Sequence, residues 1–271
     1  MDFPMTRIEN LDISRMIAGS NWFRGYSHYS AAKDKWIRQY MNLDRIVEVL
    51  NVFARNGINA YLASPDQASR EALRRVKEET GVTMHLIATP SGESIDDLMP
   101  GIEQSAEQGA AICLPHQHWT DGNLVANEQR IIGIEQATRR IRELGMIPGL
   151  STHRPETVVV CDKASYDIAT YIQIYNPIGF LCQVETDWIE RVINNTPKPI
   201  IVIKPLAAGR VLPPTGLSFV YHSIKPTDTV CIGTLSTFEA EDDIRIARDI
   251  LQSGAIRERE LQYSRSKKAL T

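Results

Sequence analysis

The chain has 271 residues, of which 43% are hydrophobic and 23% are charged, and its mean hydropathy is -0.23. This balance is that of an ordinary globular protein, and it excludes a largely disordered chain and one embedded in a membrane. The net charge of -3 provides no field that attracts nucleic acid, so we expect no nucleic-acid partner.

Short apolar segments with the character of buried strands alternate along the chain with longer amphipathic stretches. This alternation is typical of parallel βαβ units. The predicted strands span residues 16–20, 58–63, 83–89, 110–114, 147–151, 170–175, 199–204 and 229–234. There are eight of them, which is the number of strands in a (β/α)8 barrel.

The predicted helices have recognisable beginnings and ends. Asn42 is expected to cap a helix that ends near Gly57, and Pro65-Asp66 to open one that stops at Gly81. A long helix is predicted from Asn127 to Gly145, and the last helix over residues 238–251. Glycine follows a helix and precedes a strand in "NGIN", "TGVT", "QGAA" and "LGMI", as in the second half of a barrel repeat.

A doubly wound parallel sheet uses the same alternation and is the competing architecture. The eight repeats and the lack of a GxGxxG motif after the first predicted strand favour the barrel. We therefore expect an α/β fold with a single TIM-barrel domain over residues 1–271, in which residues 257–271 form a charged tail or a final helix.

The four cysteines are widely spaced and form no CxxC pair. We interpret them as buried free thiols rather than as a zinc site or a disulfide framework. The N-terminus has no basic segment followed by an apolar run and a cleavage site, so a cytoplasmic protein without membrane contact is expected. The sequence leaves the oligomeric state open.

Polar residues follow several predicted strands, in the loops where barrels of this kind carry their active sites. We predict catalytic roles for His28, His118, His153 and Lys204 and substrate binding by Asn21, Arg24, Tyr175 and Asn176. Histidine is the natural proton shuttle near neutral pH, and three such rings from different strands are expected to meet at the barrel mouth. Each histidine taken singly is more often an ordinary hydrogen-bonded loop residue than a catalyst or a ligand, and it is their convergence that favours a site.

Lys204 lies in the apolar segment "IVIKPLAAGR". A lysine there is rarely buried without a partner, so it either faces the pocket or pairs with an acid. In the pocket it would hold an anionic group or, with a pKa lowered by burial, act as a base or a Schiff-base amine.

A divalent metal ion is a further hypothesis. His116 and His118 are two residues apart, so in an extended segment both side chains point to one side, as neighbouring ligands must. The predicted metal ligands are His116, His118, His153 and Glu185, with Asp121 as another candidate carboxylate.

Several stretches together resemble the aldo-keto reductase family, over nearly the whole chain. They are "IPGLSTH", "YIQIYNP", "IIVIKPLAAGRVLPPTGLSF" and "VCIGTLSTFEAEDDIRIA", with weaker likeness in "NGINAYLAS" and in His118-Trp119. The resemblance implies an NADP-dependent oxidoreductase barrel, with Ser151 and Gln173 in the NAD(P) site.

The sequence departs from the family at the residues that carry its reaction. Leu62 stands where the resemblance implies the catalytic Asp, "SPDQ" supplies no Tyr, and Pro90 replaces the Lys, which leaves only His118. The segment "GTLSTFEAEDD" is acidic where the family holds the 2'-phosphate of NADP. The ordinary reductase mechanism therefore lacks its acid.

Three hypotheses follow. The first is an enzyme that transfers protons on a polar sugar-like or carbonyl substrate, as an isomerase, epimerase or lyase, with or without a metal ion. The second is an NAD(P)H-dependent oxidoreductase with a different catalytic set. The third is a barrel that binds a small molecule without catalysis.

Overall fold

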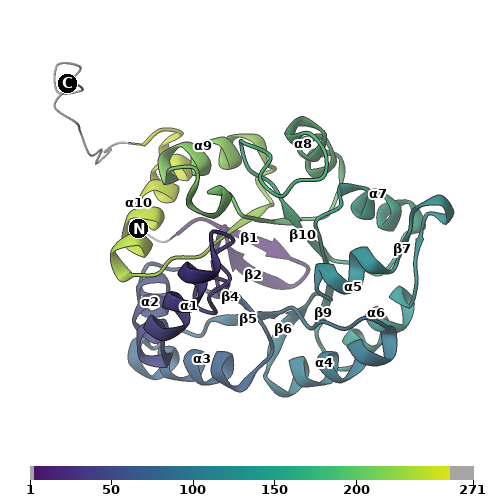
Figure 1. Cartoon of the computed structure of the whole chain (residues 1–271), viewed down its shortest axis with the longest axis horizontal. Coiled ribbons are helices and arrows are strands. Elements are labelled where there is room, and N and C mark those ends of the chain that lie inside the picture. Colours follow the sequence, from purple (N-terminus) through teal and green to yellow (C-terminus); the bar gives the residue numbers. More distant parts are fainter. Residues whose placement is uncertain (1–2, 257–271) are drawn as a thin grey trace.

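A closed barrel of eight parallel strands forms the centre of the computed structural model, which describes residues 3–256 (Figure 1). The barrel strands are β3 (Met16–Gly19), β4 (Ala60–Ala63), β5 (His85–Ala88), β6 (Ala110–Cys113), β9 (Ile147–Thr152), β10 (Thr170–Ile174), β11 (Ile200–Ile203) and β12 (Thr229–Ile232). Each pairs with the next along the chain, and β12 pairs with β3. The predicted barrel is confirmed, and the doubly wound sheet is excluded because the sheet closes.

The interior of the barrel is filled by aliphatic side chains from alternate positions of the strands. Ile17, Ala60, Ile87, Ile112, Ile172 and Ile201 belong to one cluster there, and each is at most 1% exposed. The residues between them along the strands pack outward against the helices. The barrel is therefore a packed core, as in other folds of this type, and chemistry is confined to its ends.

A short antiparallel hairpin covers the amino-terminal end of the barrel. It consists of β1 (Met5–Ile8) and β2 (Leu11–Ser14), and Figure 1 shows it lying across the centre of the ring of strands. Ile8 and Ile13 are completely buried in the same cluster as the interior side chains of the barrel. This hairpin is not among the strands predicted from the sequence.

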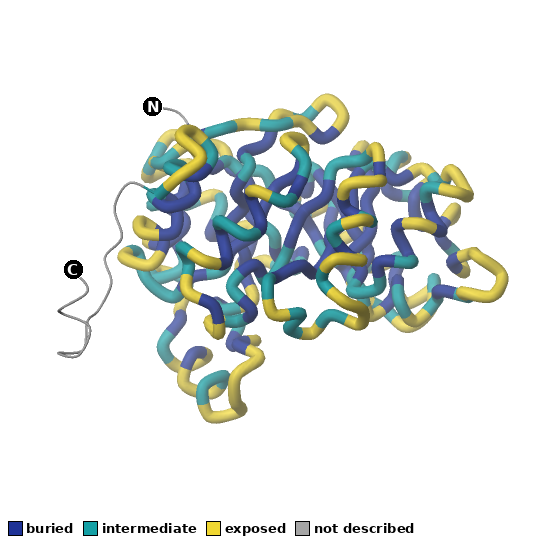
Figure 2. The backbone as a smooth tube through the Cα atoms, turned by 90° about the horizontal axis from the view of Figure 1, so that it is seen from above, coloured by how far each residue is buried: buried dark blue, intermediate teal, exposed yellow. Residues whose placement is uncertain are grey.

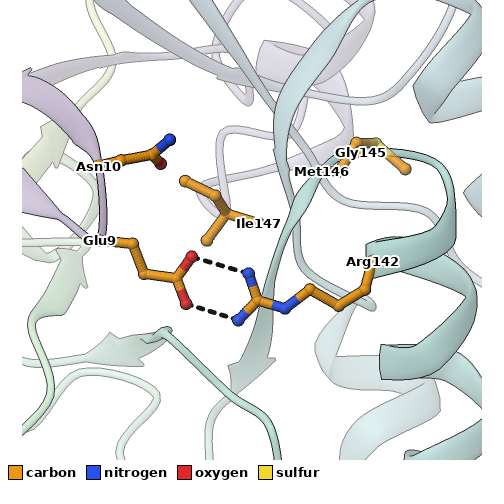
Figure 3. A pocket seen from close by; sticks show the side chains of 6 residues that line it. All are labelled: Glu9, Asn10, Arg142, Gly145, Met146 and Ile147. Carbon is orange, nitrogen blue, oxygen red and sulfur yellow. Dashed lines mark hydrogen bonds and ion pairs between the residues drawn. The ribbon is translucent and has the colours of Figure 1, made fainter.

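The turn of this hairpin is held by an arginine from the helix layer. The Arg142 guanidinium donates two hydrogen bonds to the Glu9 carboxylate, at 2.5 and 2.7 Å, beside a hollow of about 310 Å³ (Figure 3). Arg142 also donates to Asp167, at 2.8 and 3.0 Å. Three segments that are distant in the sequence are thus joined through one side chain.

Replacing Arg142 with Met is expected to lower the free energy of unfolding by about 1 kcal/mol, because the bidentate pair is partly exposed and screened by solvent. Urea denaturation measures the change. Arg130→Met is the matched control, since its pair with Glu128 lies on an exposed hairpin with both side chains 50% exposed. Equal losses in the two variants would contradict the role assigned to Arg142.

Helices form a ring outside the barrel (Figure 1). They are α1 (Ala31–Tyr40), α2 (Leu43–Arg55), α3 (Gln67–Thr80), α4 (Ile95–Glu107), α5 (Gln117–Gly122), α6 (Ile134–Glu143), α7 (Pro155–Ala164), α8 (Thr186–Asn195), α9 (Pro213–Ser223) and α10 (Thr237–Ser253), with short 3-10 turns η1 (Ala126–Glu128) and η2 (Ala207–Gly209). Exposed residues concentrate on outer turns and loops (Figure 2). No helix within residues 3–256 is both long and apolar enough to cross a membrane.

The predicted helix boundaries are confirmed where capping residues set them. The Asn42 and Asp66 side chains accept backbone N–H groups in the first turns of α2 and α3, and Gly81 ends α3 in the left-handed conformation.

The helix predicted from Asn127 to Gly145 begins too early, since only Ile134–Glu143 is α-helical. Gln129 and Gly133 have positive φ angles, and the segment forms the hairpin β7 (Leu124–Val125) and β8 (Arg130–Ile131) before α6 begins. The tail over residues 257–271 lies outside the described residues.

Candidate active site

Four titratable side chains come together at the carboxyl ends of the barrel strands. His28 lies in the loop after β3, His116 after β6, and His153 and Lys204 directly after β9 and β11. The charge of Lys204 lowers the pKa of all three histidines, and His28 and His116 also lower the pKa of His153. Coulombic effects of this kind need short separations, so we call these four residues the mouth cluster.

Lys204 reaches the mouth through an unusual backbone conformation. Along β11, Ile201 and Ile203 face the interior and Val202 faces the helices, so regular alternation would turn Lys204 outward. Its φ of 60° breaks the extended conformation. A left-handed conformation is unfavourable for lysine, and such strain is concentrated at functional sites.

Burial controls the protonation of the mouth cluster. It lowers the pKa of Lys204 to about 8, against a small opposing effect of the neighbouring thiols of Cys231 and Cys182. Burial, followed by the charge of Lys204, lowers the pKa of His153 to about 3. The pKa values of His28 and His116 are lowered for the same first reason. Near neutral pH the imidazoles are therefore uncharged, and about a tenth of Lys204 is the free amine, a far larger fraction than for an ordinary lysine.

His153 and its strand end are fixed by a carboxylate from α5. Asp121 accepts the backbone N–H of His153 at 3.0 Å and the hydroxyl of Thr152. Burial raises the pKa of Asp121, while these two hydrogen bonds lower it. The sequence makes Asp121 a candidate metal-binding carboxylate, but in the structure it orients the backbone at the end of β9.

His28 is fixed by an arginine from the loop after β11. Arg210 donates to the carbonyl oxygen of His28 at 3.0 Å. Its guanidinium lies 4.1 Å from the ring centre of Phe180 and 5.8 Å from that of Tyr29. One side chain thus contacts the loops after β3 and β10 from the loop after β11, and it adds positive charge to the rim.

The side chains of Arg24 and Asn176, two of the predicted substrate-binding residues, form contacts with other parts of the protein. Arg24 forms an ion pair with Asp66 at 2.6 Å. The Asn176 side chain bonds the backbone of Phe180 as both acceptor and donor, at 2.8 and 3.0 Å. These contacts shape the loops around the mouth.

Tyr175 points into the helix layer. Its hydroxyl contacts Glu190 at 2.9 Å and Ser223 at 3.0 Å, and its ring centre lies 5.2 Å from that of Phe219. Asn21 is exposed in the first loop. Of the four predicted substrate-binding residues, Asn21 alone is without a described side-chain hydrogen bond in residues 3–256.

The predicted metal ligands are not gathered around one point. Within residues 3–256 no group of three or more His, Cys, Asp or Glu side chains is placed to hold a metal ion. His116 caps the short helix α5, and its Nδ1 accepts the backbone N–H of His118 at 3.3 Å. The expected extended segment is therefore a helix start, which leaves His118 exposed, as is Glu185 before α8.

The residues at the implied nicotinamide site do not fit a dinucleotide. Ser151 is in register with Ile172, an interior residue, whereas Gln173 is on the opposite side of β10 with Tyr171 and Tyr175. At the amino end of α10, the Glu239 carboxylate accepts the backbone N–H of Leu235 at 2.6 Å. A phosphate there would meet this carboxylate.

Comparisons with known proteins agree on the fold. No protein-family model matches the sequence, and no curated protein matches it. A putative aldo-keto reductase from Pseudomonas aeruginosa superposes with a TM-score of 0.69 at 16% identity, over 93% of this chain and 98% of that one. A glycerol dehydrogenase from Gluconobacter oxydans gives 0.62 at 12% identity, over 97% and 100%.

An aldose reductase from Giardia lamblia gives a TM-score of 0.59 at 9% identity, over 99% of this chain and 91% of that one. The resemblance seen in the sequence is thus confirmed for the fold, which is an aldo-keto reductase-like TIM barrel.

Proposed function

We propose that this aldo-keto reductase-like barrel is an enzyme that transfers a proton on the carbon next to the carbonyl group of a small molecule. The observation that carries the proposal is Lys204, an amine without a described ion pair in residues 3–256, surrounded by His28, His116 and His153. An isomerase, an epimerase and a lyase all begin with this proton transfer.

The roles follow from the protonation of the mouth cluster. The neutral amine of Lys204 removes the proton, and its pKa near 8 suits a base at physiological pH. Negative charge then develops on the carbonyl oxygen. The neutral ring of His153 donates a hydrogen bond to that oxygen, with its backbone held by Asp121. The ammonium form of Lys204 returns the proton to the product.

The charges around the mouth favour a polar or anionic substrate. Lys204 and Arg210 are cationic, and the groups that act on Lys204 are thiols and imidazoles rather than carboxylates. Asp34, which also faces His28, is bonded to the backbone N–H and hydroxyl of Ser27. The substrate classes that fit are 2-oxo acids and sugar-like hydroxy aldehydes.

The proposal is tested by proton exchange in D2O. Pyruvate, glyceraldehyde and dihydroxyacetone are incubated with the protein, and loss of the signal from the hydrogen next to the carbonyl is followed by NMR. We expect exchange with at least one compound, reduced about a hundredfold or more in Lys204→Met and about tenfold in His153→Asn. Its rate is expected to rise with pH through about 8, because the base is the free amine.

Lys163→Met and His222→Asn are the matched controls, since Lys163 is exposed on α7 and His222 on α9. Both are expected to exchange at the wild-type rate. Absence of exchange with all three compounds, or an unchanged rate in Lys204→Met, would contradict the proposal. Binding of a compound without exchange would favour the barrel that binds without catalysis.

Reduction of a carbonyl group with NAD(P)H is the second candidate, favoured by the fold shared with the reductases. Leu62 faces the barrel interior where the resemblance implies the catalytic Asp, and Glu239 closes the amino end of α10. We therefore expect no saturable binding of NADH or NADPH in a fluorescence titration. Saturable binding at micromolar concentration would make the reductase the better candidate.

A further inference from the structure

We propose that Lys204 is a covalent nucleophile, whose Nζ forms an imine with the carbonyl carbon of the substrate. The inference rests on the proposed function, the proton transfer next to a carbonyl group, and changes the part of Lys204 in it from base to nucleophile. A base needs only to reach a proton, whereas an imine needs a free amine that carbonyl carbon can approach. Both the freedom and the access of Nζ can be read from the structure.

Two other partly buried lysines differ from Lys204 in having a carboxylate partner. Lys198 pairs with Asp162 at 3.1 Å, and Lys225 pairs with Asp228 at 2.9 Å. The amine of each of these two lysines is therefore bound by a carboxylate. For Lys204 no hydrogen bond or ion pair of the side chain is found among residues 3–256, and the groups that influence it are the thiols of Cys182 and Cys231.

The access of Nζ follows from its place at the barrel end. Lys204 is partly buried, and its Nζ has no hydrogen-bond partner within residues 3–256. Nζ is nevertheless not one of the completely buried polar atoms without a partner, so part of it remains accessible. The aliphatic chain leaves β11 beside the buried Cys231 of β12, and the interior below is filled by side chains. An incoming carbonyl compound therefore meets the amine from the side of the strand ends.

The surrounding groups favour condensation. The lone pair of the neutral amine attacks the carbonyl carbon, and the carbonyl oxygen takes up a proton that the nitrogen loses. A proton from the solvent, relayed by a neighbouring imidazole, then lets the carbinolamine hydroxyl leave as water, while the nitrogen lone pair forms the C=N bond. The product is a protonated imine, without any change in oxidation state. The neutral imidazoles of His153 and His116 accept and return the proton between these steps.

A protonated imine at Lys204 would also explain why this lysine is surrounded by the uncharged imidazoles of the mouth cluster. A positive nitrogen bonded to the former carbonyl carbon withdraws electrons from the neighbouring C–H bond more strongly than the carbonyl itself. Proton removal then falls to a neighbouring imidazole or to a bound water. Arg210 at the rim provides a charge for the carboxylate of a 2-oxo acid.

The experiment is reductive trapping. Full-length protein is incubated with pyruvate or with glyceraldehyde and sodium cyanoborohydride, and intact mass and peptide mapping locate the product. We expect a mass increase equal to the carbonyl compound less one oxygen atom, on the peptide that contains Lys204. Labelling there should be at least about tenfold faster than at any exposed lysine, because burial lowers the pKa of Lys204 to about 8, below the ordinary value for lysine.

Three variants make the outcome decisive. Lys204→Met should lose the adduct, Lys163→Met should keep it, and Lys204→Arg tests whether a permanent charge alone supports exchange. Circular dichroism checks that each variant is folded. Wild-type exchange that Lys204→Met abolishes, with no adduct at Lys204, would overturn the imine and leave the proposed function standing. Labelling spread evenly over the lysines, or full exchange activity in Lys204→Arg, would also overturn it.

Discussion

Lowering the pH from about 7 to about 4 is expected to reduce the free energy of unfolding, with a share from His153 of up to about 1.4 kcal/mol per pH unit. The pKa of His153 is lowered by burial to about 3 in the folded protein. The unfolded chain takes up a proton below about pH 6.5, which the folded protein takes up only near 3. The stabilisation is complete above about pH 6.5 and is lost progressively as the pH falls from there to about 3.

His28 and His116 add to this effect, since burial lowers their pKa values too. Buried carboxyl groups with raised pKa values, such as Asp243, act in the opposite direction as they take up protons. The contribution of one histidine is isolated by comparing urea denaturation of the wild type and of His153→Asn at each pH. His222→Asn, altered at an exposed ring on α9, is the control.

The variant His153→Asn should show a shallower decline of stability with falling pH than the wild type. Parallel pH profiles of the two proteins would mean that the His153 ring titrates as freely when folded as when unfolded. In that case the neutral imidazole assigned to the mouth cluster would be wrong.

Replacing Gly149 with Ala is expected to lower the free energy of unfolding by more than about 3 kcal/mol or to prevent folding. A methyl group at Gly149 would lie 2.7 Å from the carbonyl oxygen of Thr170 and 2.7 Å from a side-chain carbon of Leu114. The Thr170 oxygen belongs to the adjacent strand, in register with Gly149. Relief would require β9 and β10 to separate within a closed barrel.

Gly122→Ala is the control for this substitution. Gly122 ends α5, and a methyl group there would contact nothing within 4 Å. Its stability should remain within about 0.5 kcal/mol of the wild type in the same urea titration. A Gly149→Ala protein as stable as Gly122→Ala would show that the β9–β10 contact is less tightly packed than described.

The barrel was predictable because its signals are local and repeated. Apolar strands, the capping residues Asn42 and Asp66, and Gly81 each specify an element within a few residues of themselves. The β1–β2 hairpin was missed because no helix separates its two strands, so it falls outside the repeated strand–helix pattern. The strands of the β7–β8 hairpin are only two residues long. Gln129 and Gly133 have positive φ angles that keep the predicted helix from beginning before Ile134, and such angles have only weak signals in the sequence.

The candidate site was predictable in part. Strand ends placed His28, His153 and Lys204 at one rim, and the structure brings them together there, while their catalytic roles remain predictions. His116 rather than His118 joins them, because a helix begins at that point and turns the second ring to the solvent. The partners of Arg24, Tyr175 and Asn176 come from tertiary contacts, which spacing along the sequence cannot reveal.

The β1–β2 hairpin has a consequence for turnover. Ile8 and Ile13 close one end of a barrel that is already filled with side chains. A solute therefore reaches Lys204 from the other end, where the carboxyl ends of the strands lie. In the proposed reaction the product leaves and the substrate enters at this same end, so the two cannot occupy the site together. For the proposed reaction, we accordingly expect the product to inhibit competitively with the substrate.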